Sequence, residues 1–349
     1  MWWPGQLVLL LALLSSRWQT ALTQTSQNPR LGAAVNVFSR YGYLSISLRV
    51  VPRNDTDSWI FREPTLDVFQ NPQPAPPKQS KAAMVFDGDF HMEFCDNVRQ
   101  LLQAYFRDFT FERLDRPWRA FTGSWSRAAI ARHLGINASF ITGDHCYVLV
   151  RVSRFRESKR LAALGVDDGP GGLLLDEAVA REAESVTVGD QASVLRFVKN
   201  FGSHYIASYV TGNSLFQVFV YQPQVYQRIK ERLKSRGVSD LSSLELSNYF
   251  SPWYAEHIGS ILSASGNHSV EAWAAERLKL KYYIFTYASL LKLHGDANLL
   301  RQLDGLLGNE ALLQMQLKTL APLFKEPKRR QWFQEVIDNY FKLWEVNMR

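Results

Sequence analysis

The residue best suited to proton transfer in this chain is His204, in the sequence Phe201-Gly202-Ser203-His204-Tyr205. A histidine can act as a general base near neutral pH, but it needs a nucleophile within reach, and none is apparent nearby in the sequence. The chain also lacks a G-x-S-x-G nucleophile elbow and the H-E-x-x-H and C-x-x-C spacings of zinc sites. We therefore expect no enzymatic activity, no metal and no cofactor. His204 is interpreted as a structural residue that connects a helix to a sheet, and a secreted hydrolase is the minor alternative.

Cys95 and Cys146 are the only two cysteines, so they can form a disulfide in just one way. An oxidising compartment favours that bridge. In the chain-entropy model, closing a loop of about fifty residues stabilises the folded state by roughly 4 kcal/mol. We predict the disulfide, and the alternative is a pair of buried free thiols.

The elements that position His204 are an amphipathic helix and a strand. Asp190 is suited to cap the helix, because its carboxylate can accept from backbone N–H groups of the first turn. Apolar residues then recur at helical spacing as Val194, Phe197, Val198 and Phe201. Gly202 is suited to the left-handed position that ends a helix. A strand is predicted beyond it, where Phe216, Val218 and Val220 alternate with other residues. We expect Gly212 and Asn213 to interrupt that strand.

The residues from Phe201 to Tyr205, with Gly212 further on, resemble the signature of the membrane attack complex/perforin (MACPF) family. That signature is an aromatic residue, Gly, Thr, His and an aromatic residue, then a glycine pair after a six-residue gap like the one seen here. Ser203 replaces the usual threonine and keeps the hydroxyl, whereas Asn213 replaces the second glycine. Because asparagine tolerates left-handed backbone better than most residues, we expect the bend to be preserved but stiffer.

The resemblance implies an α+β fold, in which a bent, twisted four-stranded antiparallel sheet is flanked by two helical clusters. By position, the clusters would lie at about residues 87–141 and 223–275. The MACPF domain would span residues 24–293, with a Pro-rich excursion at 52–81, and a C-terminal helical extension would follow at 294–349.

The hydrophobic pattern predicts where the individual elements lie. The strands are predicted at residues 44–50, 145–155, 215–221 and 278–290. The helices are predicted at residues 96–109, 124–134 and 225–234, and the pattern is helical throughout from 296 to 349.

Several features of the sequence indicate secretion. Residues 1–23 have the length and apolar core of a signal peptide and are too short to span a bilayer. Three N-glycosylation acceptors follow, at Asn54, Asn137 and Asn267. No later segment reaches about 18 uninterrupted apolar residues. We expect a soluble, extracellular glycoprotein.

The formal net charge of +7 favours acidic partners such as anionic lipid headgroups, glycans or proteins. Nucleic acid is a poor partner for a secreted chain. Candidate contacts for an anionic surface lie on the helix predicted at 225–234, and they are Arg228, Lys230, Arg232 and Lys234. A solvated basic face without a partner is the alternative. Trp253, Tyr254 and Trp273 are candidates for interfacial contacts or for core packing.

In pore-forming members of the family, the two helical clusters unfurl into membrane-spanning hairpins. A transmembrane β-strand needs about ten residues that alternate apolar towards lipid and polar towards the lumen. Between Val98 and Phe109, each of the two strand faces would carry a charged residue. Between Val225 and Leu233, the better face still carries Gln227 and Glu231. An Arg or Lys on the lipid face costs about 2–4 kcal/mol near the midplane, so the sequence argues against a pore.

We therefore predict a secreted, non-enzymatic signalling cofactor that acts at an extracellular surface. The resemblance implies a role in the localised activation of the receptor tyrosine kinase Torso during terminal patterning of the embryo. The implied partners are the extracellular matrix of the eggshell (vitelline membrane) or an anionic plasma membrane, the ligand pathway of the Torso receptor, and further copies of the chain in a homo-oligomer. The alternative is a membrane-inserting, pore-forming lytic protein.

Overall fold

The computed structural model describes residues 29–38, 68–70, 72, 74, 91–161, 174–236 and 243–347. Its centre is a sheet whose main strands lie side by side in the order β3 (His91–Cys95), β5 (Cys146–Arg160), β7 (His204–Tyr221) and β12 (Ala311–Thr319). Each neighbouring pair of these strands is antiparallel. A further strand, β4 (Phe109–Phe111), extends the sheet by pairing in parallel with β12.

The central strand β7 is paired on both edges along most of its length. One edge pairs with β1 (Ala34–Val35) and then with β5. The other edge pairs with β12, then with β9 (Leu262–Ser263) and β8 (His257–Ile258). All but two of the residues of β7 are buried. Every polar side chain on this strand therefore needs a partner inside the protein.

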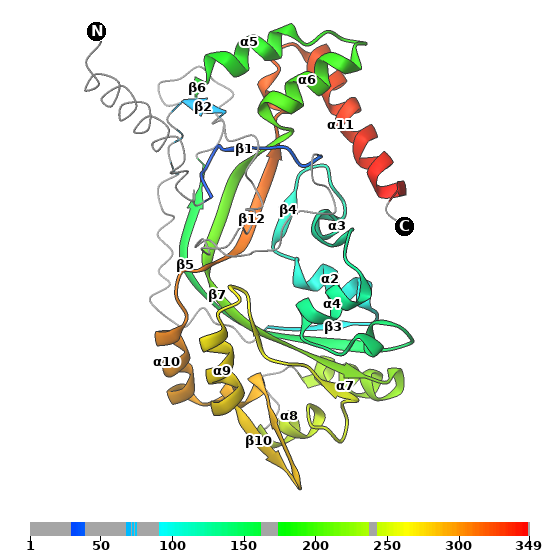
Figure 1. The fold of residues 1–349 in the computed structure, drawn as a ribbon, viewed down its shortest axis with the longest axis vertical. Coiled ribbons are helices and arrows are strands. Elements are labelled where there is room, and N and C mark those ends of the chain that lie inside the picture. Colours follow the sequence, from blue (N-terminus) through cyan, green and yellow to red (C-terminus); the bar gives the residue numbers. More distant parts are fainter. Residues whose placement is uncertain are drawn as a thin grey trace, which may run out of the picture.

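The bend of the sheet lies where β5 passes Gly212, and β5 and β7 curve together there (Figure 1). The predicted interruption of β7 is wrong, because the strand continues through Gly212 and Asn213. The irregularity lies in β5 instead, where the register shifts between Phe155 and Glu157. A Cβ at Gly212 would overlap the carbonyl oxygen of Arg154, so only glycine allows the two strands to approach this closely.

Two helical clusters pack on opposite faces of the sheet. The first cluster consists of α2 (Val98–Tyr105), β4, α3 (Pro117–Thr122), α4 (Arg127–Leu134) and the short helix η1 (Ala138–Ile141). The second cluster consists of α7 (Pro223–Arg236), α8 (Ser243–Tyr249), β8, β9 and α9 (His268–Arg277). The alternation of β5 separates their cores, because Tyr147 and Leu149 pack with the first cluster whereas Val148 and Val150 pack with the second.

The remaining elements cover the two ends of the molecule (Figure 1). At one end lie α5 (Glu177–Ser185), α6 (Gln191–Phe201) and α11 (Pro327–Asn347), with the paired strands β2 (Phe69–Gln70) and β6 (Leu174–Leu175) nearby. At the other end lie the hairpin of β10 (Lys279–Tyr282) and β11 (Phe285–Ala288), the short helix η2 (Leu290–Leu293) and α10 (Ala297–Leu306). The turn η3 (Ala321–Leu323) joins β12 to α11.

The predicted α+β fold, with a bent sheet between two helical clusters, is confirmed. The described sheet has more than the four predicted strands, because β1, β4, β8 and β9 also pair within it, and β4 runs parallel to β12. Asp190 caps α6 as expected, since its carboxylate accepts from the N–H of Ala192 at 2.9 Å. The helices predicted at 96–109, 124–134 and 225–234 correspond to α2, α4 and α7. The predictions for residues 1–23 and 44–50, for Asn54 and for most of the excursion at 52–81 lie outside the described residues.

The fourth strand of the sheet is not the one that the sequence predicted. Residues 278–290 contain the separate β10–β11 hairpin, which pairs with itself. The fourth strand is β12, within the segment predicted to be helical throughout. Its period-two signal is visible in hindsight, because Met315 and Leu317 are buried while Gln316 and Lys318 are more exposed. The sheet thus draws on residues from both sides of the predicted boundary at 293/294.

The predicted disulfide is not formed, and Cys95 and Cys146 are buried free thiols. Cys95 lies opposite Tyr147 in the β3–β5 pair, and successive residues of a strand point to opposite faces. Accordingly, Cys95 packs in the core of the first cluster and Cys146 in that of the second. Burial raises the pKa of both thiols, that of Cys95 to about 12, so neither is a reactive thiolate.

Gly202→Ala is expected to destabilise the fold by about 2–4 kcal/mol, because the turn after α6 admits only glycine. Gly202 has φ +83° and ψ −179°, and an added Cβ would lie 2.6 Å from the carbonyl oxygen of Val35. Gly305→Ala in α10 is the matched control, since no atom lies within 4 Å of the added Cβ. Replacing a helical glycine should stabilise by up to about 1 kcal/mol. Denaturant unfolding of both variants measures the difference, and equal stabilities would contradict this account of the turn.

Candidate functional site

His204 is the first residue of β7, and its imidazole is completely buried. The ring atom Nε2 lies 3.0 Å from the carbonyl oxygen of Glu112, and Nδ1 lies 2.8 Å from the hydroxyl of Ser203. Because a carbonyl oxygen only accepts, Nε2 carries the proton and the Ser203 hydroxyl donates to Nδ1. Burial lowers the pKa of His204 to about 4, so the ring is neutral near pH 7.

These bonds connect the signature residues to the first cluster. Glu112 directly follows β4, and its carboxylate accepts from the N–H of Thr319 in β12 at 2.8 Å. His204 therefore joins β7 to the end of β4, rather than joining a helix to the sheet. Ser203 and His204 form a hydrogen-bonded pair that sequence reasoning missed, but both are 0% exposed, so the pair has no access to a substrate.

Asn213, at the position of the second signature glycine, is the centre of a buried polar group that we call the bend network. Its members are Asn213, Ser263, Ser265, Asn267 and Glu310. The amide nitrogen of Asn213 donates to Ser265 Oγ at 2.9 Å and to Glu310 Oε2 at 3.3 Å. Its amide oxygen accepts from Ser263 Oγ at 3.2 Å and from the N–H of Ser265 at 3.3 Å.

The bend network joins three parts of the chain. Asn213 lies at the bend of β7, Ser263 and Asn267 lie at the end of β9 and the start of α9, and Glu310 directly precedes β12. Asn267 Nδ2 donates to the same Glu310 carboxylate at 3.2 Å. Asn213 thus acts through its side chain, which connects the bend to the second cluster.

Gln217 makes a second buried connection on β7, four residues beyond Asn213. Its side chain is 0% exposed, and Nε2 donates to the carbonyl oxygens of Gly259 at 2.8 Å and Ala288 at 2.9 Å. Its Oε1 accepts from the N–H of Leu290 at 2.9 Å. A glutamine between the apolar residues of a buried strand indicates that its side chain has a hydrogen-bond partner inside the protein, and the sequence analysis did not use this signal.

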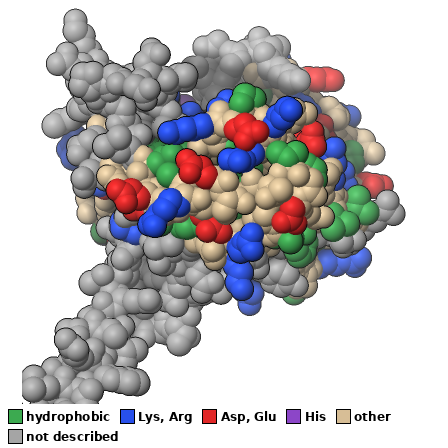
Figure 2. All heavy atoms as spheres, turned by 90° about the horizontal axis from the view of Figure 1, so that it is seen from above, with side chains coloured by type: hydrophobic (Ala, Val, Ile, Leu, Met, Phe, Trp, Pro, Cys, Tyr) green, Lys and Arg blue, Asp and Glu red, His purple; other side chains and the backbone are tan. Residues whose placement is uncertain are grey.

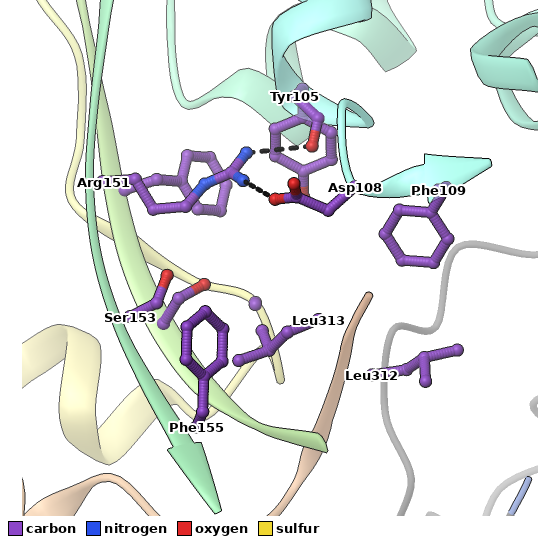
Figure 3. Close-up of a pocket in the computed structure, with 11 residues that line it drawn as sticks. Tyr105, Asp108, Phe109, Arg151, Ser153, Phe155, Leu312 and Leu313 are labelled. Carbon is purple, nitrogen blue, oxygen red and sulfur yellow. Dashed lines mark hydrogen bonds and ion pairs between the residues drawn. The ribbon is translucent and has the colours of Figure 1, made fainter. Parts of the chain in front are cut away.

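Arg151 of β5 makes the corresponding connection to the first cluster (Figure 3). Its guanidinium donates to the carbonyl oxygen of Tyr105 at 2.9 Å and lies 3.6 Å from Asp108 Oδ2. The side chain is only 13% exposed, and burial lowers its pKa. Because the last carbonyls of a helix lack partners and carry partial negative charge, this cation stabilises the end of α2.

The cavity beside Arg151 is small. It has a volume of about 20 Å³, and Phe155 and Leu313 are among the residues that line it (Figure 3). This is room for one or two water molecules and not for a substrate. Among the residues that the structure describes, no three acidic, histidine or cysteine side chains are placed to hold a metal ion. Within the same ranges, none of the helices combines the length and apolarity that a membrane span requires.

The basic residues predicted to contact an anionic surface lie on α7, and the structure distributes them differently. Lys230 is 2.6 Å from Asp96 Oδ1 and is largely buried, and this contact, together with a bond from Tyr226, lowers the pKa of Asp96. Arg232 lies 3.9 Å from Glu245, whereas Arg228 is exposed. The side chain of Lys234 lies outside the described set. At least two of the four therefore contact acidic groups of the chain itself.

The three aromatic candidates also differ in their surroundings. Trp253 and Tyr254 are 75% and 38% exposed, in the segment between α8 and β8. Trp273 of α9 instead packs against the core of the second cluster. Core packing thus accounts for Trp273 but not for Trp253.

Two predicted glycosylation sites lie in described segments, and glycosylation at both stays a prediction. Asn137 is exposed, and it uses Oδ1 to accept from Ser139, whereas a glycan attaches to Nδ2. In Asn267, Nδ2 donates to Glu310 within the bend network. A glycan on Asn267 would therefore have to displace that bond.

Comparison with known proteins returns neither a matching family profile nor a matching curated protein. Similar solved structures include GNIP1Aa from Chromobacterium piscinae, with a TM-score of 0.47 and 11% identity over 90% of this chain and 57% of that one. A putative cell invasion protein with a MAC/perforin domain from Bacteroides thetaiotaomicron has a TM-score of 0.38 and 8% identity over 90% and 61%. Astrotactin-2, a vertebrate perforin-like membrane protein involved in neuronal development, has a TM-score of 0.33 and 14% identity over 88% and 99%. The chain spans less than two thirds of the first two.

His204→Gln is expected to weaken the pH dependence of stability between pH 6.5 and pH 4. The unfolded chain protonates this histidine near 6.5, whereas the folded-state pKa is about 4. Proton uptake by the unfolded state therefore lowers stability as the pH falls through this window, by on the order of 3 kcal/mol in full. Above pH 6.5 the contribution is constant.

Urea unfolding of both chains near neutral pH and at about pH 4.5 measures this difference. Glutamine is the suitable replacement, because its amide can donate to Glu112 in place of Nε2. His133 and His257 also have pKa values lowered by burial, but both chains contain them, so their effects cancel. The same pH dependence in both chains would show that His204 is not a buried neutral histidine.

Asn213→Ala is expected to destabilise the protein by about 2–3 kcal/mol, because it removes the acceptor of the buried Ser265 N–H and of the Ser263 hydroxyl. The hydroxyls of Ser263 and Ser265 keep the bond that they make to each other. Asn298→Ala is the matched control, since Asn298 is exposed on α10, and it should change stability by no more than about 0.5 kcal/mol. Thermal unfolding of the two variants tests the difference. A neutral Asn213→Ala would show that water satisfies the bend network instead.

Proposed function

We propose that this protein is a secreted, non-enzymatic signalling cofactor of MACPF type that binds an extracellular surface without perforating it. The observation that best supports this function is the bend network. It connects the second cluster to the strand from which that cluster would have to separate during membrane insertion. A pore-former needs its clusters to leave the sheet, whereas a docking protein does not.

Separating either helical cluster from the sheet would cost a large amount of free energy. Releasing the second cluster breaks the bonds of Asn213 and Gln217 and the pairing of β8 and β9 with β7. Releasing the first cluster breaks the His204–Glu112 bond, the contacts of Arg151 and the pairing of β4 with β12. Each buried polar group left without a partner costs about 1–3 kcal/mol. The closed arrangement is therefore favoured over an unfurled one.

The sequence of the clusters supports the same proposal. A strand built from α7 would place Glu231 or Arg232 against lipid, and both are exposed to solvent in the helix. Lys230 and Asp96 would also lose each other as partners. Charged residues at the bilayer midplane cost several kcal/mol, with Arg and Lys at about 2–4 kcal/mol each. Inserting α7 into the membrane as a strand would thus break its contacts within the protein and place charged side chains against lipid.

The finer role that we propose comes from the sequence resemblance to Torso-like, a secreted protein of the MACPF family. We propose that the chain promotes the localised activation of the receptor tyrosine kinase Torso in embryonic terminal patterning. Binding to the eggshell matrix or to an anionic plasma membrane would concentrate it there. At that surface it would promote the release, processing or presentation of the receptor's ligand.

The purified, glycosylated chain is expected to bind liposomes of graded anionic content without releasing encapsulated calcein. Binding should weaken as salt is added, because screening shortens the range of surface charges to about 10 Å at 0.1 M salt. Detergent lysis gives the full-release reference. Leakage accompanied by ring-shaped oligomers would contradict the proposal and establish the pore-forming alternative. Failure to bind at any anionic content would refute docking to a membrane.

A further inference from the structure

The hairpin of β10 and β11 projects from the end of the molecule opposite α5, α6 and α11 (Figure 1). Its turn consists of Tyr283 and Ile284, between the paired residues Tyr282 and Phe285. Tyr283 is 87% exposed, Ile284 89% and Phe285 55%. Tyr283 and Ile284 are the two most exposed large apolar side chains among the described residues. Three consecutive side chains of this kind in water mark a contact surface.

The backbone of the tip is strained. Tyr283 has φ +52°, in the left-handed region that bulky residues rarely adopt. Two-residue hairpin turns usually place glycine or asparagine at such a position, because those residues adopt it without strain. This chain keeps an aromatic side chain there, although that side chain is almost fully exposed to solvent. Strain at an exposed tip is typical of a site that binds something outside the protein.

The hairpin also carries charge of one sign. No acidic residue lies between Glu276 and Asp296, and the basic residues in that interval are Arg277, Lys279, Lys281 and Lys292. Lys279 and Lys281 are exposed on one face of β10, whereas Leu280 and Tyr282 point to the other. Lys292 Nζ donates to the carbonyl oxygens of Arg277 at 2.8 Å and Lys279 at 3.0 Å, which stabilises the base of the hairpin.

The charged side chains are distributed differently at the opposite end of the molecule. Figure 2 views that end, and on the part drawn in colour Lys and Arg side chains alternate with Asp and Glu. Cations and anions interspersed in this way partly cancel each other's effect on an anionic surface. The projecting end combines exposed apolar residues with unopposed lysines, which is the composition of a site for an anionic membrane interface.

We propose that the hairpin tip, Tyr283-Ile284-Phe285, inserts into the headgroup region of an anionic membrane while Lys279 and Lys281 contact lipid phosphates. This inference rests on the proposed surface docking and names the contact that performs it, in place of α7. Tyrosine suits the interface because its ring is apolar and its hydroxyl is polar. A four-residue strand is far too short to cross a bilayer, so the tip reaches only the interface.

A second copy of the chain is the other candidate occupant, because β10 and β11 pair only with each other in the described structure. Pairing of two hairpins through their β10 edges would bring the lysines of both copies together, and like charges on neighbouring strands repel. An anionic membrane removes this repulsion. Charge complementarity therefore favours lipid over self-association.

Vesicle sedimentation of the full chain with Ile284→Asp tests the proposal, using phosphatidylcholine with about 30% phosphatidylserine. We expect binding to fall by about tenfold or more, because a carboxylate at the tip opposes both insertion and charge attraction. Leu343→Asp on α11 is the matched control, since Leu343 is 57% exposed at the opposite end, and its binding should match the wild type. Lys281→Gln should reduce binding by about fivefold and weaken its salt dependence.

Tyr283→Gly separates a binding role from a structural one. Glycine relieves the left-handed strain, so the variant should be at least as stable as the wild type in thermal unfolding. Its binding to the same vesicles should nevertheless fall by about tenfold or more. Parallel losses of stability and binding would show that Tyr283 serves the fold and would overturn the proposal.

The outcomes distinguish this inference from the proposed function. Vesicle binding by the wild type that Ile284→Asp leaves unchanged would overturn the hairpin site and leave surface docking intact. No vesicle binding by the wild type would overturn the hairpin site and also docking to a membrane. If light scattering shows a lipid-free oligomer that Ile284→Asp dissociates, a second copy covers the tip, and the membrane proposal is wrong.

Discussion

Polar side chains buried within one strand determine how the rest of the molecule is arranged. Because β7 is paired on both edges and covered on both faces, bulk water cannot satisfy His204, Asn213 or Gln217. Each must obtain its hydrogen bonds from the segment that packs against it, or cost about 1–3 kcal/mol. His204 obtains one from the end of β4, and the other two obtain theirs from the second cluster and the segment after it. The positions of both clusters follow from these requirements.

The same requirement opposes a change of shape. A hydrophobic contact can slide or re-form elsewhere, whereas a buried amide loses its partners as soon as the segment moves. Both effects meet at the bend of the sheet. Gly212 permits the close approach of β5, whereas its neighbour Asn213 holds Ser265, between β9 and α9, through a hydrogen bond. A second glycine would supply backbone freedom without any connection to α9 or β12. Asparagine at this position therefore favours a defined arrangement over mobility.

The sequence predicted the parts of the fold that depend on local pattern, and it failed where the partner is distant. The cap at Asp190, the end of α6 at Gly202 and the helix α7 follow from spacing over a few residues. The bond from His204 to Glu112 spans 92 positions, and no local pattern encodes it. Residues 278–290 do form strands, as their alternation predicted, but an alternating pattern does not show which strand pairs with which. These strands pair with each other, and the partner of β7 is β12, which the sequence analysis missed. For the same reason the cysteine count could not show that the register separates Cys95 from Cys146.

The density of basic residues along the sequence also failed to predict which side chains are available to contact an anionic surface. The basic helix α7 uses Lys230 within the protein, where it neutralises Asp96 beside the start of α2. The hairpin contains fewer candidate residues, yet nothing in the described structure covers its tip, and its backbone is strained. Natural sequences tend to be consistent between local preference and fold except at functional positions. His204, Asn213 and Gln217 are satisfied inside the sheet, although the buried Thr211 hydroxyl of β7 has no partner in the described structure. The β10–β11 turn combines left-handed backbone at Tyr283 with the two most exposed large apolar side chains of the described residues, and this combination is the physical reason for inferring the surface contact there.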